Sequence, residues 1–345
     1  MRASRLMSFA AAAALLVGLA GCSQPAGSAG QGSEASSSAD AAAFPVTIKH
    51  AFGETVVKSK PTRVATVAWA NHEVPLALGI VPVGMAKADY GDDDADGVLP
   101  WVKEQLDELG ATTPVLFDET DSIDFEAVAD TKPDVILAAY SGLSKSDYET
   151  LSKIAPTVAY PGVAWGATLE QMITMESLAI GMKSEGEALI AKLHATTETD
   201  VEKHPALAGK SVLWGYFDPS DLSKVGFYTT NDSRPAFLEQ IGMTTPEAVS
   251  SASAKTDEFY TTISAEAADS LDDVDVIVTY GDAALLKKLQ ADPLIGKIPA
   301  IERGSVAPLT DDTPLAAGAN PSPLSIDWGL EDYLALIDTA AGKVG

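Results

Sequence analysis

The chain has 345 residues, with 49 acidic and 23 basic side chains and a formal net charge of −26. This negative charge argues against nucleic acid and against anionic lipid surfaces as binding partners. The chain has one cysteine, which excludes an internal disulfide framework.

The first 21 residues have the pattern of a signal peptide. Arg2 and Arg5 form a positively charged region before an apolar run at residues 6–19. The run is shorter than the roughly 20 residues of a membrane span. The Leu-Ala-Gly-Cys sequence that ends at Cys22 resembles the lipobox of bacterial lipoproteins, in which the cysteine is acylated and the chain is cut before it. The alternative is an ordinary secretory cleavage site beside an unrelated cysteine. The lipobox implies a chain anchored by Cys22 at the outer face of the cytoplasmic membrane.

Residues 22–43 are predicted to be a flexible linker. After Cys22 the segment consists almost wholly of serine, glycine, alanine and small polar residues. Such a composition buries too little apolar surface to order itself. About 300 residues remain from Phe44 onward, which is enough for two lobes of ordinary domain size.

The segment 44–166 is predicted to form the first α/β lobe. Residues 64–68, 80–85 and 135–140 are short aliphatic or β-branched runs bounded by proline, glycine or polar residues, as expected of buried strands. A helix is expected after the first of them, from about Asn71. The alternation of strands and helices indicates a parallel sheet covered by helices.

The segment 167–205 is predicted to be one long connecting helix. Apolar residues recur through it near a period of 3.6, although Gly181 and Gly186 weaken the pattern by about 1 kcal/mol each. A continuous helix would join the lobes as a stiff strut and permit only modest closure.

The segment 206–345 is predicted to form the second α/β lobe. Residues 211–217, 274–280 and 305–309 are its strand candidates, and helical signals occur at 239–243 and 283–290. The predicted fold is therefore α/β, with two Rossmann-like lobes of mainly parallel sheets joined by one long helix.

Five motifs in order resemble the class III substrate-binding proteins of ABC importers, in the branch that binds ferric siderophores. The match covers residues 44–337. The motifs are VTIKHAFGETVV at 46–57, KPTRVA at 60–65, ALGIVPVG at 77–84, FEAV and KPDVIL between 125 and 137, and IAPTV at 154–158. Each motif is weak alone, but the five are specific in this order and spacing.

The resemblance implies a monomeric binding protein that captures a preformed Fe(III)–siderophore chelate between its lobes. It would deliver the chelate to an ABC permease dimer and its ATPase, with no cofactor of its own. The same fold also binds cobalamin or haem in other members, and this alternative stays open. Tryptophan quenching by each ligand class would distinguish them.

One exposed glutamate on each lobe pairs with arginines of the importer in this family. The matching positions are Glu126 and Glu266, each of which opens a short helix that leads to a strand. Two carboxylates at equivalent places would fix the orientation of docking. The alternative is that each glutamate only favours the helix dipole.

Aromatic residues recur where predicted strands or lobes end, which is where ligands bind in α/β lobes. Aromatic walls suit a bulky ligand with apolar faces and polar tips. Each of these residues alone is about as consistent with the core as with the cleft. The candidates are Trp69, Tyr140, Trp165, Trp214, Tyr216, Tyr228 and Tyr280.

Arginine is scarce beyond the signal peptide, where only Arg63, Arg234 and Arg303 occur. Arg63 and Arg303 stand at positions with a structural explanation, whereas Arg234 precedes a predicted helix. Several family members present an arginine to the siderophore from this place. A guanidinium can donate two hydrogen bonds to chelate oxygens. The alternative is an ion pair with Asp232 or Glu239.

Direct metal binding and catalysis are both disfavoured. The four histidines are scattered, no cysteine beyond Cys22 assists them, and Leu76 stands where a zinc hydrolase motif starting at His72 needs a second histidine. No nucleophile elbow or phosphate loop occurs. With few cations available, a hydroxamate or mixed siderophore is favoured over an anionic tris-catecholate.

Overall fold

The computed structural model describes residues 44–345. The signal peptide, Cys22 and the linker lie outside the described residues, so their assignments stay predictions. None of the helices within residues 44–345 combines the length and apolarity that a bilayer span requires.

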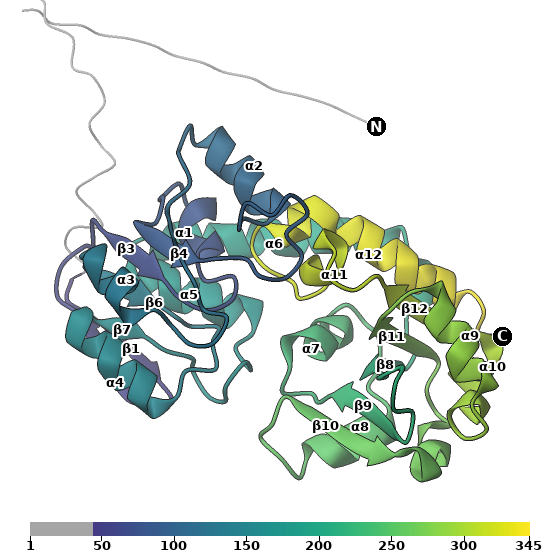
Figure 1. The fold of residues 1–345 in the computed structure, drawn as a ribbon. Helices are drawn as coiled ribbons and strands as arrows, with labels where there is room; N and C mark the ends of the chain where they lie inside the picture. The colour runs from purple at the N-terminus through teal and green to yellow at the C-terminus, as the bar shows by residue number, and fades with distance from the viewer. Residues whose placement is uncertain (1–43) are drawn as a thin grey trace, which may run out of the picture. The chain divides into compact units, whose positions relative to one another are not determined.

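The first half of the described chain is built on a five-stranded parallel sheet (Figure 1). Its order is β5-β4-β3-β6-β7, and every residue of the central strands β3 and β6 is buried, as in a sheet covered on both faces. The strands are β3 (Val64–Thr66), β4 (Gly84–Ala86), β5 (Val115–Phe117), β6 (Val135–Leu137) and β7 (Thr157–Val158). The helices between them are α1 (Glu73–Ala77), α2 (Pro100–Glu108), α3 (Phe125–Asp130) and α4 (Lys145–Ile154).

A separate antiparallel hairpin precedes this sheet. It pairs β1 (Val46–His50) with β2 (Gly53–Val57), and Gly53 has a φ of 126°, which an L side chain rarely adopts. The alternating burial of β1 places Val46, Ile48 and His50 inward.

The second half is built on a mixed five-stranded sheet of order β10-β9-β8-β11-β12. β8, β11 and β12 are parallel, whereas β9 pairs antiparallel with β8 on one side and with the edge strand β10 on the other. The strands are β8 (Val212–Tyr216), β9 (Lys224–Tyr228), β10 (Tyr260–Ser264), β11 (Val276–Tyr280) and β12 (Val306–Leu309). The helices are α7 (Ser233–Gln240), α8 (Glu247–Ser253), α9 (Ala283–Ala291) and α10 (Pro299–Arg303), with 3₁₀ turns η2 (Pro205–Leu207), η3 (Ala265–Leu271) and η4 (Ile295–Lys297). The α/β class predicted from the sequence is confirmed.

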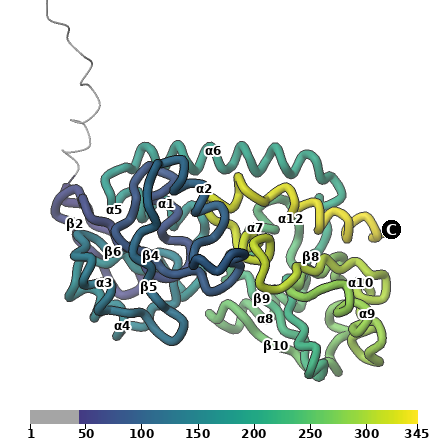
Figure 2. The backbone as a smooth tube through the Cα atoms, turned by 45° about the horizontal axis from the view of Figure 1, so that its top comes forward, coloured from purple at the N-terminus to yellow at the C-terminus, as the bar shows by residue number. Residues whose placement is uncertain are grey.

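The prediction of one continuous connecting helix is wrong. The segment forms α5 (Leu169–Ala179) and α6 (Lys183–Glu202), separated at Gly181, whose φ is 71°. The Met182 amide donates to the Ser177 carbonyl at 2.8 Å and the Gly181 amide to the Leu178 carbonyl at 3.2 Å. This is the Schellman arrangement, in which a left-handed glycine ends a helix. α6 alone then runs from the first half to the second (Figure 2).

The end of the chain returns to the first half. α11 (Pro314–Gly318) leads into α12 (Ser325–Ala341), and the Trp328 ring lies 5.1 Å from that of Trp101 in α2. The carboxylate of Glu73 accepts hydrogen bonds from the Trp101 indole at 2.8 Å and the Leu324 amide at 2.9 Å. Burial raises the pKa of Glu73 to about 7, although these hydrogen bonds lower it. Residues 206–345 therefore do not pack only within the second lobe.

The two halves share one hydrophobic core. Its cluster joins Val64 and Val135 of the first sheet, Trp214 and Val276 of the second, and Leu334 of α12. Because protein interiors are close-packed, a large rotation of one half against the other would open this core. Its packing favours the small closure expected from the sequence.

Candidate functional site

In both sheets the order of strands reverses between two central neighbours, β3 and β6 in the first half and β8 and β11 in the second. The crevice beyond the carboxyl ends of such strands is the usual ligand position in α/β sheets. Trp69 follows β3 and Tyr140 follows β6, while Tyr280 ends β11. The topology therefore brings these three predicted residues to the cleft ends of their sheets.

The backbone at and beside Trp69 and Trp165 in the first half is strained. Ala68, Ala70 and Trp165 have φ values of 61°, 62° and 60°, in the left-handed region that non-glycine residues rarely occupy. Such conformations cost on the order of 1–3 kcal/mol each and tend to occur at functional sites. The Trp165 ring stands edge-on to the Tyr140 ring, with centroids 5.4 Å apart. Trp69 and Trp165 both line the cleft cavity described below.

Arg234 is held on the second half by an ion pair and an aromatic face. Its Nε and Nη2 each lie 2.8 Å from an oxygen of Asp232, whose side chain is fully buried and also caps α7. Its Nη1 donates to the Tyr280 hydroxyl at 3.0 Å. The guanidinium carbon lies 3.6 Å from the centroid of the Tyr228 ring. The ion pair with Asp232, which the sequence left open as the alternative to ligand contact, is thus present.

The ion pair does not exhaust the hydrogen bonds that Arg234 can make. A guanidinium has five N–H donors, and the contacts to Asp232 and Tyr280 use three of them. Arg234 also lines a cavity of about 220 Å³ that draws on both halves of the chain. The cavity is lined by Trp69, Tyr140, Trp165, Asp232, Arg234, Phe259 and Asn320.

A polar network closes the floor of the cleft. The Tyr140 hydroxyl lies 3.0 Å from the Ser233 hydroxyl and accepts from the Asn320 amide at 3.1 Å. Ser233 in turn donates to the Asn320 carbonyl oxygen at 2.7 Å. Burial raises the pKa of Tyr140, so its phenol stays neutral. The network joins one residue of the first half to two of the second.

Two residues that line the cleft cavity, Phe259 and Asn320, were not predicted from the sequence, nor was Tyr90, which packs against Tyr280. The Tyr90 hydroxyl donates to Asp311 at 2.8 Å, and its ring packs edge-on to Tyr280 at 6.0 Å between centroids. All three lie outside helices and strands, so no periodic pattern marks them.

Two predicted ligand residues lie elsewhere. Trp214 is 1% exposed, and its indole donates to the Tyr333 hydroxyl at 3.0 Å. The prediction that Trp214 lines the cleft is wrong, since its ring packs beneath Tyr228 and Tyr280. Tyr216 is 42% exposed at the end of β8 and is not among the residues that line the cavity with Arg234.

A second, larger cavity of about 470 Å³ lies within the first half. Trp69 and Trp165 line both cavities, so the two spaces meet at these rings. Glu119 lines it and accepts a hydrogen bond from the strained Ala68 amide at 2.8 Å. Burial, reinforced by Asp89 and opposed by this hydrogen bond, raises the pKa of Glu119 to about 7. Burial lowers the pKa of His72 to about 4, so its imidazole is neutral at pH 7.

The described chain matches the model of the periplasmic binding protein family over residues 64–313, more than half of its length. The chain belongs to the periplasmic binding protein family. The resemblance stated from the sequence motifs is therefore confirmed at the level of the family.

Several known proteins are similar to this periplasmic binding protein. The crystal structure of PiaA from Streptococcus pneumoniae in complex with ferrichrome is 47% identical, with a TM-score of 0.84 over 87% of this chain and 100% of PiaA. The probable siderophore-binding lipoprotein YfiY of Bacillus subtilis is 29% identical over 257 residues, 73% of this chain and 74% of YfiY. The Fe(3+)-citrate-binding protein YfmC of Bacillus subtilis is 24% identical over 265 residues, 76% of this chain and 77% of YfmC.

Both glutamates predicted to dock this periplasmic binding protein to its permease are exposed. Glu126 lies in the first turn of α3, which Asp124 caps, and Glu266 lies in the first turn of η3, which Ser264 caps. α3 leads to β6 and η3 leads to β11, and each of these strands pairs with the first parallel strand of its sheet. The two side chains therefore occupy equivalent places on the two halves.

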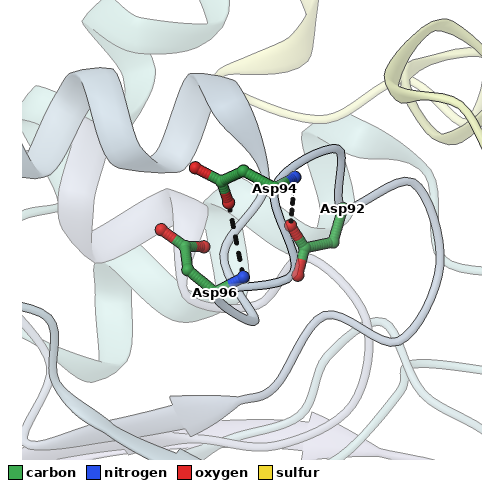
Figure 3. Close-up of side chains that lie close together, drawn as sticks. All are labelled: Asp92, Asp94 and Asp96. Atoms are coloured by element: carbon green, nitrogen blue, oxygen red, sulfur yellow. Dashed lines mark hydrogen bonds between the residues drawn. The ribbon is translucent and has the colours of Figure 1, made fainter.

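One acidic loop of this periplasmic binding protein has the spacing of cation ligands. Carboxylate oxygens of Asp92, Asp94 and Asp96 lie within 4.8 Å of one another (Figure 3). Asp92 accepts from the backbone amides of Asp94 and Gly97, which folds the loop onto itself. The Lys103 ammonium lies 2.6 Å from both Asp94 and Asp96. The Lys103 ammonium therefore already neutralises part of the charge of these three carboxylates.

Proposed function

We propose that this protein captures a ferric siderophore in the cleft between its halves and delivers it to an ABC importer. The observation that carries the proposal is Arg234, held in a cavity walled by Trp69 and Trp165 with N–H donors to spare. The 47% identity to ferrichrome-bound PiaA over its whole length supports it. Chelate oxygens would accept from Arg234, and the tryptophan faces would contact the organic shell around the iron.

The cargo we favour is a neutral or weakly charged hydroxamate chelate. Of the three arginines in the described residues, Arg63 donates to the Thr131 and Lys132 carbonyls, and Arg303 donates to Ser305 and the Asp275 carbonyl. These contacts give both side chains a structural role and leave Arg234 as the arginine that lines the cleft. A tris-catecholate carries more negative charge than one ion-paired arginine balances.

The remaining parts of the function follow from the same proposal. Lipidated Cys22 would anchor the chain outside the cytoplasmic membrane, which agrees with the name of YfiY as a lipoprotein. Glu126 and Glu266 would contact basic residues of the permease. The chelate arrives complete, so the protein needs no metal ligands or cofactor, and it releases its cargo unchanged.

The proposed function predicts saturable quenching of tryptophan fluorescence by ferric trihydroxamates. Two of the five tryptophans, Trp69 and Trp165, line the cleft cavity. The chain from residue 23 onward is titrated with ferrichrome, ferrioxamine B, a ferric tris-catecholate, cobalamin and haemin, with free N-acetyltryptophanamide correcting for light absorption. We expect tight saturation by the trihydroxamates. Saturation by cobalamin or haemin alone would overturn the assignment of a siderophore as the cargo. Tighter binding of the catecholate would overturn the hydroxamate assignment.

Displacement of Trp165 offers a second prediction. A Cβ placed on Gly142 would lie 2.3 Å from the Trp165 indole nitrogen, so Gly142→Ala forces the ring to move. We expect ferrichrome affinity to fall about tenfold, which corresponds to roughly 1.4 kcal/mol. The measurement is isothermal titration calorimetry. Gly162→Ala is the matched control, because a Cβ there meets nothing within 4 Å and affinity should not change. Equal affinities for the two variants would remove Trp165 from the binding surface.

A further inference from the structure

The cavity of about 470 Å³ in the first half carries an excess of acidic groups. Lys87 is the one basic side chain on its wall that is charged at pH 7, since His72 is neutral. Asp147 is partly engaged in capping α4 through Ser144. The acidic lining residues are Asp89, Glu119, Asp121 and Asp147.

Two side chains on this wall each have a buried polar atom without a hydrogen-bond partner in residues 44–345. His72 is 7% exposed, and its Nδ1 is buried and unpaired within the described residues. Glu119 uses Oε2 to accept from Ala68, whereas its Oε1 is buried with no partner among the same residues. A buried polar atom without a partner costs about 1–3 kcal/mol.

Both unpaired atoms fit the role of acceptor. Above its pKa of about 7, the Glu119 carboxylate has only acceptor sites, and a neutral imidazole offers one acceptor nitrogen. The group that completes this wall is therefore a hydrogen-bond donor, and the surplus of carboxylates favours a positively charged one. A chelate oxygen, which is itself an acceptor, does not meet this requirement.

The cavity is placed to receive part of a ligand bound in the cleft. Trp69 and Trp165 line both spaces, so an arm that leaves the chelate between these rings enters the cavity beside Glu119. Apolar side chains, among them Met85 and Leu99, form much of the remaining wall. Such a lining suits a methylene chain that ends in a charged donor.

We propose that this cavity binds an alkylammonium arm of the ferric siderophore, with Glu119 as its principal acceptor. The inference rests on the proposed function and names the class of siderophore within it: a hydroxamate chelate that carries a free primary amine. Neutral chelates would occupy the cleft without filling the cavity.

The test compares two ligands that differ only at the arm. Ferrioxamine B carries a free terminal amine, and N-acetylation of that amine gives a neutral ligand with the same iron coordination. The titration is made at about pH 8, where Glu119 is mostly ionised and an alkylamine of pKa about 10.4 is still protonated. We expect the wild-type chain to bind the ammonium form at least about tenfold more tightly.

Variants assign the preference to the cavity. Glu119→Gln keeps an oxygen for the Ala68 amide but removes the charge, and it should reduce the preference for the ammonium form to within about threefold. Asp118→Asn makes the same charge change at an exposed neighbour outside the cavity and should keep the full preference.

The outcomes separate the inference from the function beneath it. Equal affinity of the wild-type chain for the two ferrioxamine forms, with tight ferrichrome binding, overturns the ammonium site and leaves siderophore capture intact. A preference that survives Glu119→Gln overturns the assignment to Glu119. Failure of every ferric siderophore to bind overturns the proposed function itself.

Discussion

Replacement of Arg234 by alanine is expected to weaken ferrichrome binding at least about tenfold and to destabilise the fold at the same time. The affinity falls because the cleft loses the guanidinium donors of Arg234, which lines the cavity. The stability falls because Asp232, fully buried, is left charged and without its ion-pair partner. Breaking a buried pair costs about 3–5 kcal/mol. Calorimetric titration and thermal unfolding measure the two effects separately.

A double variant separates the two roles of Arg234. Arg234→Ala with Asp232→Asn removes both charges, and asparagine still caps a helix well. We expect most of the lost stability to return while ferrichrome affinity stays low. If affinity returns together with stability, Arg234 serves only to satisfy Asp232 and makes no contact with the chelate.

The central strands were predictable because their sequences carry the signal that burial imposes. Five of the six predicted strands contain an observed one, and β3, β6, β8 and β11 among them are short apolar runs with little exposed surface. The run predicted at 80–85 overlaps β4 only at its end, because β4 begins at Gly84. Three of the missed strands carry a weaker signal. β5 begins with an exposed valine, β7 has two residues, and β10 is only partly buried.

The break at Gly181 shows what periodicity leaves undecided. The apolar repeat continues on both sides of the glycine, so the pattern predicts one helix and a small local penalty. The left-handed φ of Gly181 depends on its surroundings, where a Cβ would come within 2.7 Å of the Phe44 ring. That contact is between segments far apart in the sequence. A single glycine therefore ended a helix that its neighbours favoured.

Part of the candidate site could be predicted from position along a strand. Trp69 and Tyr140 lie just past the ends of their strands and line the cleft cavity, and Tyr280 at the end of β11 accepts a hydrogen bond from Arg234, whereas Trp214 lies in the middle of β8 and is core. Because β8 is buried on both faces, the alternation of polar and apolar residues could not distinguish aromatic residues of the core from those of the cleft. Tertiary folding alone brings Phe259 and Asn320 to the cleft and Tyr90 to Tyr280. The hydrogen bond between Glu119 and the Ala68 amide also depends on it.

Reversing the charge of both exposed glutamates is expected to stop uptake while leaving capture intact. Glu126→Arg with Glu266→Arg replaces two carboxylates at equivalent places by two cations, which would repel basic residues of the permease. Neither side chain lines the cleft or the cavity beside Glu119. We expect unchanged ferrichrome affinity and loss of ferrichrome import into cells that carry the variant as their sole copy. Each single reversal should give partial import.

A matched control removes the effects of helix ends and of net charge. Each docking candidate lies in the first turn of a helix, where reversal of a negative charge costs about 0.3–1 kcal/mol. Glu185 and Glu247 are also exposed first-turn glutamates, on α6 and α8, so their double reversal carries the same cost and the same charge change. We expect that control to import normally. Equal import by the two double variants would place the permease contact on another surface, because electrostatic pairing at Glu126 and Glu266 could not survive two added cations.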